Sequence, residues 1–384
     1  MNRWRPLAVI AAATVLAACN KDEGVEPPAE LVDLKATLVV KELWSTSIGG
    51  GDEKMRVALG LAEDGGTLFA ASRGGEVRAL DPGNGRARWE TDTKLELSGG
   101  PGAGEGLVVV AASGGDVLGL EAASGKQRWR VNVGGEVLAA PLVTADRVVV
   151  RTVDGRLKGL AAGDGKEAWM VEDLVPRLSL RGTAPPVRAG DAVICGFDSG
   201  KLMAVSLGSG DILWQAQVST PSGRSELDRL ADVDSAVRVS ENDVYVVGYQ
   251  GRVTMVGLDT GQIWWARDLS SYRGLTLDDD QLYVATSEGD VVALRRRDGT
   301  TVWQQTGLKR RALGTPAMHA GAVVVGDFDG YLHWIDRNGG RFVARERPGR
   351  TRIAAVPLVV GDNMYVIDDG GRVAAFRSGD ASGG

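Results

Sequence analysis

The sequence predicts an all-β protein, an eight-bladed β-propeller of four-stranded antiparallel blades. Three observations predict it: the glycine content, a repeated glycine pattern and a repeated glycine–tryptophan pair. Glycine accounts for 54 of the 384 residues, about twice its usual share, so turns are frequent. A pattern of Gly-x-(Val or Leu)-x-x-apolar occurs eight times, 38 to 51 residues apart, beginning at Gly75, Gly115, Gly155, Gly200, Gly251, Gly289, Gly330 and Gly371. Such a period, with alternating apolar residues, is typical of propeller blades.

The second marker has the same period. In six repeats a tryptophan follows a glycine by four residues: Gly85/Trp89, Gly125/Trp129, Gly165/Trp169, Gly210/Trp214, Gly261/Trp265 and Gly299/Trp303. The residue ten positions before the tryptophan is small in five of the six, with Met255 as the exception. We expect Phe342 or Val343 to take the tryptophan's place in the next repeat. These tryptophans, with Trp44, are predicted to form a structural ring that locks the blades together.

The way the ring closes can be predicted from the strands that are missing at the two ends of the repeat. Each unit also holds two earlier strand-like runs, such as Leu107–Ala112, which makes four strands per blade. The last unit has no tryptophan strand after it, and Trp44 has no unit before it. We therefore expect residues 40–377 to form one propeller in which the N-terminal strand joins the last blade. This closure removes an open sheet edge.

The N-terminus has the features of a secretion signal. Arg3 and Arg5 precede an uncharged apolar run from Leu7 to Ala18, which is too short to cross a bilayer as a helix. The run ends in Leu-Ala-Ala-Cys, which resembles a bacterial lipobox, so residues 1–18 are predicted to be a lipoprotein signal peptide and Cys19 the lipidated residue. The alternative is an ordinary signal peptide that happens to end beside a cysteine.

The segments that flank the propeller differ from it in composition. Residues 19–39 are acidic and contain a Pro-Pro pair, and they are predicted to be the lipidated N-terminus and a tether. Asn20 after the lipobox cysteine resembles an outer-membrane sorting signal, with the protein on the periplasmic face. Residues 378–384 are predicted to be a flexible tail.

Two consecutive repeats are longer than the others, at 45 and 51 residues. The extra residues fall in equivalent connections between blades, at 175–186 and 225–236, so we expect the two loops to lie side by side. Between residues 178 and 181 the first loop carries two leucines and an arginine, and the second loop carries a cluster of acidic residues with one arginine. The residues are Leu178, Leu180, Arg181, Asp228, Arg229, Asp232 and Asp234. This combination favours a protein-binding patch. An internal pair between Arg181 and the aspartates is equally compatible with the sequence.

Several of these motifs carry a family resemblance. Residues 79–89 and 259–265 resemble the repeat of pyrroloquinoline-quinone propellers. Residues 178–182, 226–230 and 232–234 resemble motifs of the BamB family, the lipoprotein subunits of the outer-membrane β-barrel assembly machinery. The resemblance implies a non-enzymatic scaffold whose long loops bind the periplasmic POTRA domains of BamA.

By motif match, five loop residues inherit that binding role, and the charged pair in the second loop is assigned it more weakly. The five are Leu178, Leu180, Arg181, Asp232 and Asp234, and the weaker pair is Asp228 and Arg229. Nascent outer-membrane proteins are a further candidate partner. Two alternatives remain: a periplasmic propeller that binds another envelope protein or polymer, and, least favoured, a quinoprotein dehydrogenase.

The composition argues against an enzyme active site or a metal site. Two histidines and two cysteines make a catalytic triad or a multi-histidine metal site hard to assemble. We predict no catalytic residue, no metal and no cofactor, a buried inert thiol at Cys195 and structural roles for His319 and His333. A net charge of −6 argues against nucleic acid as a partner. Arg295, Arg296 and Arg297 form a basic spot at a predicted strand end.

Overall fold

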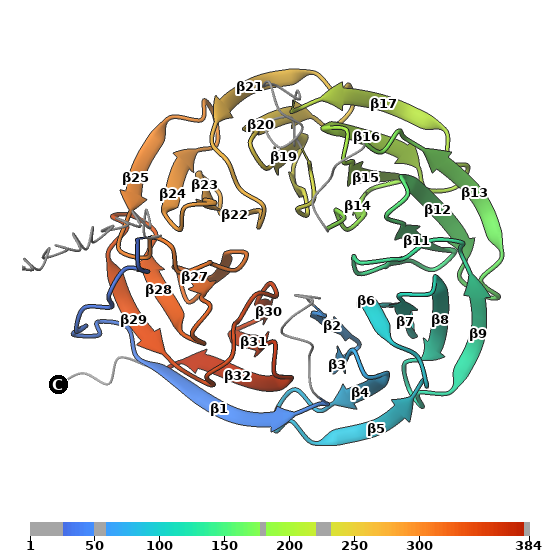
Figure 1. The fold of residues 1–384 in the computed structure, drawn as a ribbon, viewed down its shortest axis with the longest axis horizontal. Coiled ribbons are helices and arrows are strands. Elements are labelled where there is room, and N and C mark those ends of the chain that lie inside the picture. Colours follow the sequence, from blue (N-terminus) through green and yellow to red (C-terminus); the bar gives the residue numbers. More distant parts are fainter. Residues whose placement is uncertain (1–25, 50–58, 177–181, 220–231, 380–384) are drawn as a thin grey trace, which may run out of the picture.

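The computed structural model describes residues 26–49, 59–176, 182–219 and 232–379. These residues form eight four-stranded antiparallel sheets that are arranged as the blades of a closed ring (Figure 1). The predicted all-β, eight-bladed propeller is therefore confirmed. Cys19 and the signal segment lie outside the described residues. Within the described ranges, no helix is long and apolar enough to cross a membrane.

The strands are named in chain order. The innermost strands are β2 (Leu61–Asp64), β6 (Leu97–Gly104), β10 (Leu142–Val143), β14 (Val187–Ala189), β18 (Arg238–Ser240), β22 (Leu275–Leu277), β26 (Ala317–His319) and β30 (Leu358–Val360). The second strands are β3 (Thr67–Ala71), β7 (Leu107–Ala112), β11 (Arg147–Arg151), β15 (Ala192–Gly196), β19 (Asp243–Val247), β23 (Gln281–Ala285), β27 (Ala322–Gly326) and β31 (Asn363–Ile367).

Two further strands complete each blade. The third strands are β4 (Glu76–Leu80), β8 (Asp116–Glu121), β12 (Arg156–Ala161), β16 (Lys201–Ser206), β20 (Arg252–Gly257), β24 (Val291–Arg295), β28 (Leu332–Asp336) and β32 (Arg372–Ser378). The outer strands are β5 (Ala87–Asp92), β9 (Gln127–Asn132), β13 (Glu167–Glu172), β17 (Ile212–Gln217), β21 (Ile263–Asp268), β25 (Thr301–Gln305), β29 (Phe342–Glu346) and β1 (Val40–Ser47). Blades 1 to 8 begin at β2, β6, β10, β14, β18, β22, β26 and β30.

The ring closes as predicted, because the first strand of the chain completes the last blade. In blade 8 the strand order is β1-β32-β31-β30, and β1 runs antiparallel to β32 with Trp44 opposite Ala375. The core lies between blades: buried apolar residues of adjacent blades form common clusters, for example Phe69 of blade 1 with Val110 of blade 2. Each blade thus buries its two faces against its neighbours.

The predicted tryptophan ring is present and joins seven pairs of neighbouring blades. Each indole Nε1 donates a hydrogen bond of 2.5–3.0 Å to a backbone carbonyl of the next blade. The donors are Trp44, Trp89, Trp129, Trp169, Trp214, Trp265 and Trp303. Because a buried indole N–H needs an acceptor, this bond also fixes how adjacent blades are oriented.

The glycine of each pair is needed because it receives the ring of the preceding blade. A Cβ on Gly165 would lie 2.7 Å from the ring of Trp129, and the φ of Gly165 is +75°. Gly85 and Gly210 meet Trp44 and Trp169 in the same way. Only glycine satisfies both the close approach and the left-handed backbone.

The interface between blades 7 and 8 is built differently, and one expectation about it was wrong. Neither Phe342 nor Val343 takes the tryptophan's place, because Ala344 occupies that position, opposite Trp334. The large and small residues have exchanged strands, so Trp334 is fully buried on β28. Its Nε1 donates to His319 Nδ1 (3.1 Å), and His319 Nε2 donates to the Asp362 carbonyl of blade 8 (3.1 Å). A histidine thus links the indole to the next blade.

Candidate functional site

The two long connections each join the outer strand of one blade to the innermost strand of the next. One runs from β13 to β14 and the other from β17 to β18, which confirms that they are equivalent connections. Five of the predicted site residues lie in segments outside the described residues: Leu178, Leu180, Arg181, Asp228 and Arg229. Asp232 and Asp234, at the end of the second connection, are described.

The described ends of the two connections meet above blades 4 and 5, as the repeat lengths predicted. A Cβ on Gly182, in the first connection, would lie 2.8 Å from the carboxylate of Asp234 in the second. The Asp232 carbonyl accepts a hydrogen bond from the Tyr249 amide (3.0 Å), and Val233 is fully buried. The end of the second loop is therefore held against the turns of the blades rather than projecting into solvent.

A buried arginine lies beneath this junction. Arg151, at the end of β11, is 1% exposed, and its Nη2 is 3.4 Å from Oδ1 of Asp198. Its guanidinium also stacks on the ring of Phe197, 4.5 Å from the centroid. Both Asp198 and Phe197 belong to the turn that follows β15. Arg151 thus joins blade 3 to blade 4 directly under the loops.

Several carboxyl groups lie close together in a poorly solvated environment at this point. The pKa of Asp234 is raised well above its ordinary value, first by burial and then by the nearby carboxylates of Asp232 and Asp198, while Arg151 opposes the rise. Burial also raises the pKa of Asp198 despite its pair with Arg151. The region formed by Arg151, Asp198, Asp232 and Asp234 is called the acidic junction below. Its poorly solvated carboxylates favour a further cation or hydrogen-bond donor.

The first connection is also fixed where it leaves β13. Asp173 is 8% exposed, accepts a 2.7 Å hydrogen bond from Nζ of Lys201 and also accepts one from the Ser199 hydroxyl. The Asp173 amide donates to the Gly155 carbonyl (3.0 Å). The start of the first loop and the end of the second are therefore both anchored in polar contacts with blades 3 to 5.

The structure separates the roles of the two described aspartates. Asp232 is 1% exposed, so its side chain suits holding the loop, whereas Asp234 is half-buried. Sequence reasoning missed Arg151 and Asp198. An arginine that ends an apolar strand was the only signal for the first, and nothing in the sequence linked it to a residue 47 positions away.

The cysteine and the histidine that could have taken part in catalysis or metal binding, Cys195 and His333, are buried in the core of the blades. Cys195 is buried, as predicted, and burial raises the pKa of its thiol to about 12, which disfavours the reactive thiolate. Oδ2 of Asp327 lies 3.0 Å from His333 Nε2, and both residues are 0% exposed. Burial lowers the pKa of His333, so this histidine is neutral at physiological pH. Among the described residues there is no group of three or more candidate metal ligands.

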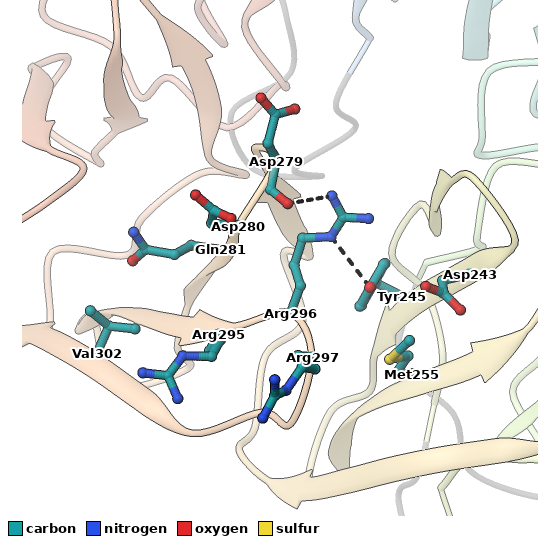
Figure 2. Close-up of a pocket in the computed structure, with 10 residues that line it drawn as sticks. All are labelled: Asp243, Tyr245, Met255, Asp279, Asp280, Gln281, Arg295, Arg296, Arg297 and Val302. Atoms are coloured by element: carbon teal, nitrogen blue, oxygen red, sulfur yellow. Dashed lines mark hydrogen bonds between the residues drawn. The ribbon is translucent and has the colours of Figure 1, made fainter.

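A second polar surface lies on the opposite face, between blades 5 and 6. Figure 2 shows this open groove, in which Arg296 is fixed by the Tyr245 hydroxyl (3.3 Å) and the Asp279 carbonyl (2.9 Å). Arg295 and Arg297 of the same groove are exposed. The basic spot thus divides into one structural arginine and two solvated ones, and it is remote from the acidic junction.

Comparison with known proteins agrees with the repeat analysis. A family model described as "Outer membrane protein assembly factor BamB" matches residues 73–305 and 288–382. A protein of that name from Pseudomonas aeruginosa is 47% identical over 98% of this chain and 99% of its own length. The crystal structure of BamB from Moraxella catarrhalis superimposes with a TM-score of 0.82 at 27% identity, over 88% of this chain and all of the other.

A quinohemoprotein alcohol dehydrogenase from Comamonas testosteroni also superimposes, with a TM-score of 0.73, over 89% of this chain and 77% of the enzyme. At 13% identity that likeness shows the fold alone. By contrast, the similarity to the assembly factors extends over the full length of the chain, at 47% identity for the Pseudomonas aeruginosa protein. With its repeat, its closed ring and its paired long connections, the chain belongs to the BamB family.

Proposed function

We propose that the protein is a lipid-anchored scaffold of the outer-membrane β-barrel assembly complex and that it binds the POTRA domains of BamA. Its anchor is Cys19, which places the propeller on the periplasmic face of the outer membrane. The full-length similarity to proteins named as assembly factors, rather than as enzymes, supports this role.

The observation that carries the proposal is the meeting of the two long connections at the acidic junction. These connections depart most from the blade repeat, and on a propeller the loops rather than the blades carry function. Asp234 is half-buried there, beside Gly182 of the other loop. Leu178, Leu180, Arg181 and Asp234 would form the contact surface, with Asp228 and Arg229 at its edge. Asp232 would hold the second loop in place.

The test is recovery of BamA with the full-length lipoprotein, purified from membranes. Arg181→Glu reverses a charge of the proposed surface and should weaken binding by about 2 kcal/mol, roughly 30-fold. Asp234→Lys should act in the same direction. Asp279→Lys is the matched control, because it places the same change on an exposed aspartate of the opposite face.

Undiminished recovery of BamA with folded Arg181→Glu and Asp234→Lys would refute the loop assignment. A loss that Asp279→Lys shares would place the contact elsewhere on the ring. If the alternative role holds, with another envelope protein or polymer as the partner, the wild-type protein itself should recover no BamA. Nascent outer-membrane proteins would be a second partner, and cross-linking to an unfolded barrel precursor tests for them.

A further inference from the structure

The segment before the first strand, residues 26–39, lies along blade 7 instead of extending away from the ring. The Ala29 amide donates to the Lys309 carbonyl (2.9 Å), and Arg310 Nε donates to the Pro27 carbonyl (3.1 Å). Further along, the amides of residues 37 and 38 both donate to the Val343 carbonyl, at 2.9 and 3.0 Å. The segment therefore contacts the blade from one end of β29 to the other.

Two arginines of blade 7 also donate hydrogen bonds to the backbone of this segment. Arg311 Nη1 donates to the Ala29 carbonyl (3.1 Å), and Arg345 Nη1 donates to the Val32 carbonyl (2.8 Å). Carbonyl groups of an extended segment are good acceptors for guanidinium groups, and bonds to a charged donor are stronger than neutral ones.

Both arginines are held in place from within the blade. Arg311 Nε lies 2.7 Å from the buried carboxylate of Asp327, and Arg345 Nε donates to His333 Nδ1 (3.2 Å). His333 in turn contacts Asp327, so one buried network orients both guanidinium groups. The docking surface is thus formed by the blade itself and does not depend on the segment.

Apolar side chains complete the contact. Leu31 packs against the cluster that contains Trp303 and Leu308, and Leu38 packs against the cluster that contains Trp334. Val32, between them, is 67% exposed. The segment therefore has one side that faces the blade and one that faces solvent, as an ordered strap does.

We propose that residues 26–39 are a docked strap that sets where the lipid anchor leaves the ring and therefore which edge faces the bilayer. This inference rests on lipidation of Cys19, which is part of the proposed function. From Cys19 to Glu26 is seven residues, which span at most about 25 Å when extended. If the chain were free up to Val40, the same anchor would reach about 70 Å.

The strap holds the anchor on the side of the ring away from the acidic junction. Its first described residues lie beside Lys309 and Arg310, in the connection that enters blade 7. Figure 1 places blade 7 across the ring from blades 3 and 4, which carry the first long connection. Because Lys309 and Arg310 lie in an outer-to-inner connection, the anchor leaves from the same face as the long loops but at the opposite rim, so the edge of blade 7 lies nearer the lipid surface than the loops do.

The test measures how close two edges of the ring come to a bilayer. Single cysteines replace Arg350, beside blade 7, and Leu174, which is 85% exposed in the first long connection. Both lie in outer-to-inner connections and so on the same face. Cys195 does not compete for a thiol-reactive fluorophore, because it is buried and its pKa is raised to about 12. The lipidated protein is placed in phospholipid vesicles that carry a headgroup energy acceptor.

We expect stronger energy transfer from the label at 350 than from the label at 174. Releasing the strap with Ala29→Pro and Leu31→Asp should abolish that difference, since one change removes an amide donor and the other an apolar contact. Val32→Asp is the matched control: it adds the same charge to the solvent side of the strap and should leave the difference intact.

Equal transfer at both sites in the wild-type protein would overturn the proposal, and so would a difference that survives release of the strap. Cleavage by trypsin after Lys35 checks the release directly, because docking protects that bond and the double variant should lose the protection. Mass measurement of the N-terminal peptide reports lipidation of Cys19 separately. A lipidated protein with equal transfer refutes the strap alone, whereas a protein without lipid refutes the anchor.

Discussion

Two regions of this ring bury polar groups in opposite ways. Where Trp129 meets Gly165, a neutral indole donates one hydrogen bond and no charge is buried. At the acidic junction, carboxylates share a poorly solvated site with Arg151. Burying charge costs free energy that an apolar interface would not. The comparison indicates that the regular interfaces stabilise the ring without burying charge, whereas the irregular one buries charged groups at a cost in free energy.

The largest effect should come from removing the cation of the acidic junction. Arg151→Met leaves Asp198 and Asp234 without the guanidinium that lowers their pKa values, and should cost about 3–5 kcal/mol of unfolding free energy. Urea unfolding measures it. Adding Asp198→Asn should restore part of the loss. If Arg151→Met unfolds at the wild-type urea concentration, the pair contributes nothing and the two regions do not differ as described.

A regular interface can be broken by a single methyl group. Gly165→Ala forces a Cβ into the ring of Trp129 at a positive φ, and should cost about 2–4 kcal/mol. Gly163→Ala is the matched control in the same turn, because a Cβ there meets nothing within 4 Å. The midpoints of thermal unfolding of both variants measure this loss of stability, and we expect only the midpoint of Gly165→Ala to fall. Equal midpoints would mean that the glycine–tryptophan contact does not stabilise the ring.

The smallest effect concerns pH. Because the pKa of Asp234 is raised on folding, the native state holds its proton more tightly than the unfolded state does. This carboxyl therefore reduces stability as pH rises from about 4 toward neutrality. Asp234→Asn removes that contribution and should raise the thermal midpoint at pH 7 by about 2 °C, with less effect at pH 4. A midpoint that falls at pH 7 would show that the ionised carboxylate has a stabilising partner.

Much of the ring could be predicted from local patterns. The glycine period marked all eight blades, and the missing outer strand after Gly371 predicted that Trp44 would close the ring. The error at Ala344 has a physical cause: an interface needs a certain volume of buried side chain, and either of two paired strands can supply it. In blade 7 the tryptophan lies on β28, so a pattern that follows one strand misses it.

The strap and the acidic junction were not predictable in this way. Residues 26–39 have the composition of a tether, and their order comes from contacts with Arg311 and Arg345, which lie 282 and 313 positions later in the chain than their partners. Likewise, no local pattern connects Arg151 with Asp198. Contacts between distant segments depend on how the blades are stacked, and composition does not record that.

The amino-acid sequence by itself determined the number of blades, the way the ring closes and the place where the repeat is broken, because turns and strand alternation are local properties of the chain. Only the tertiary structure decided which charges are buried together and where the N-terminal segment lies. Burial and Coulomb interactions depend on distances in space, and the ring brings together residues that are far apart in sequence.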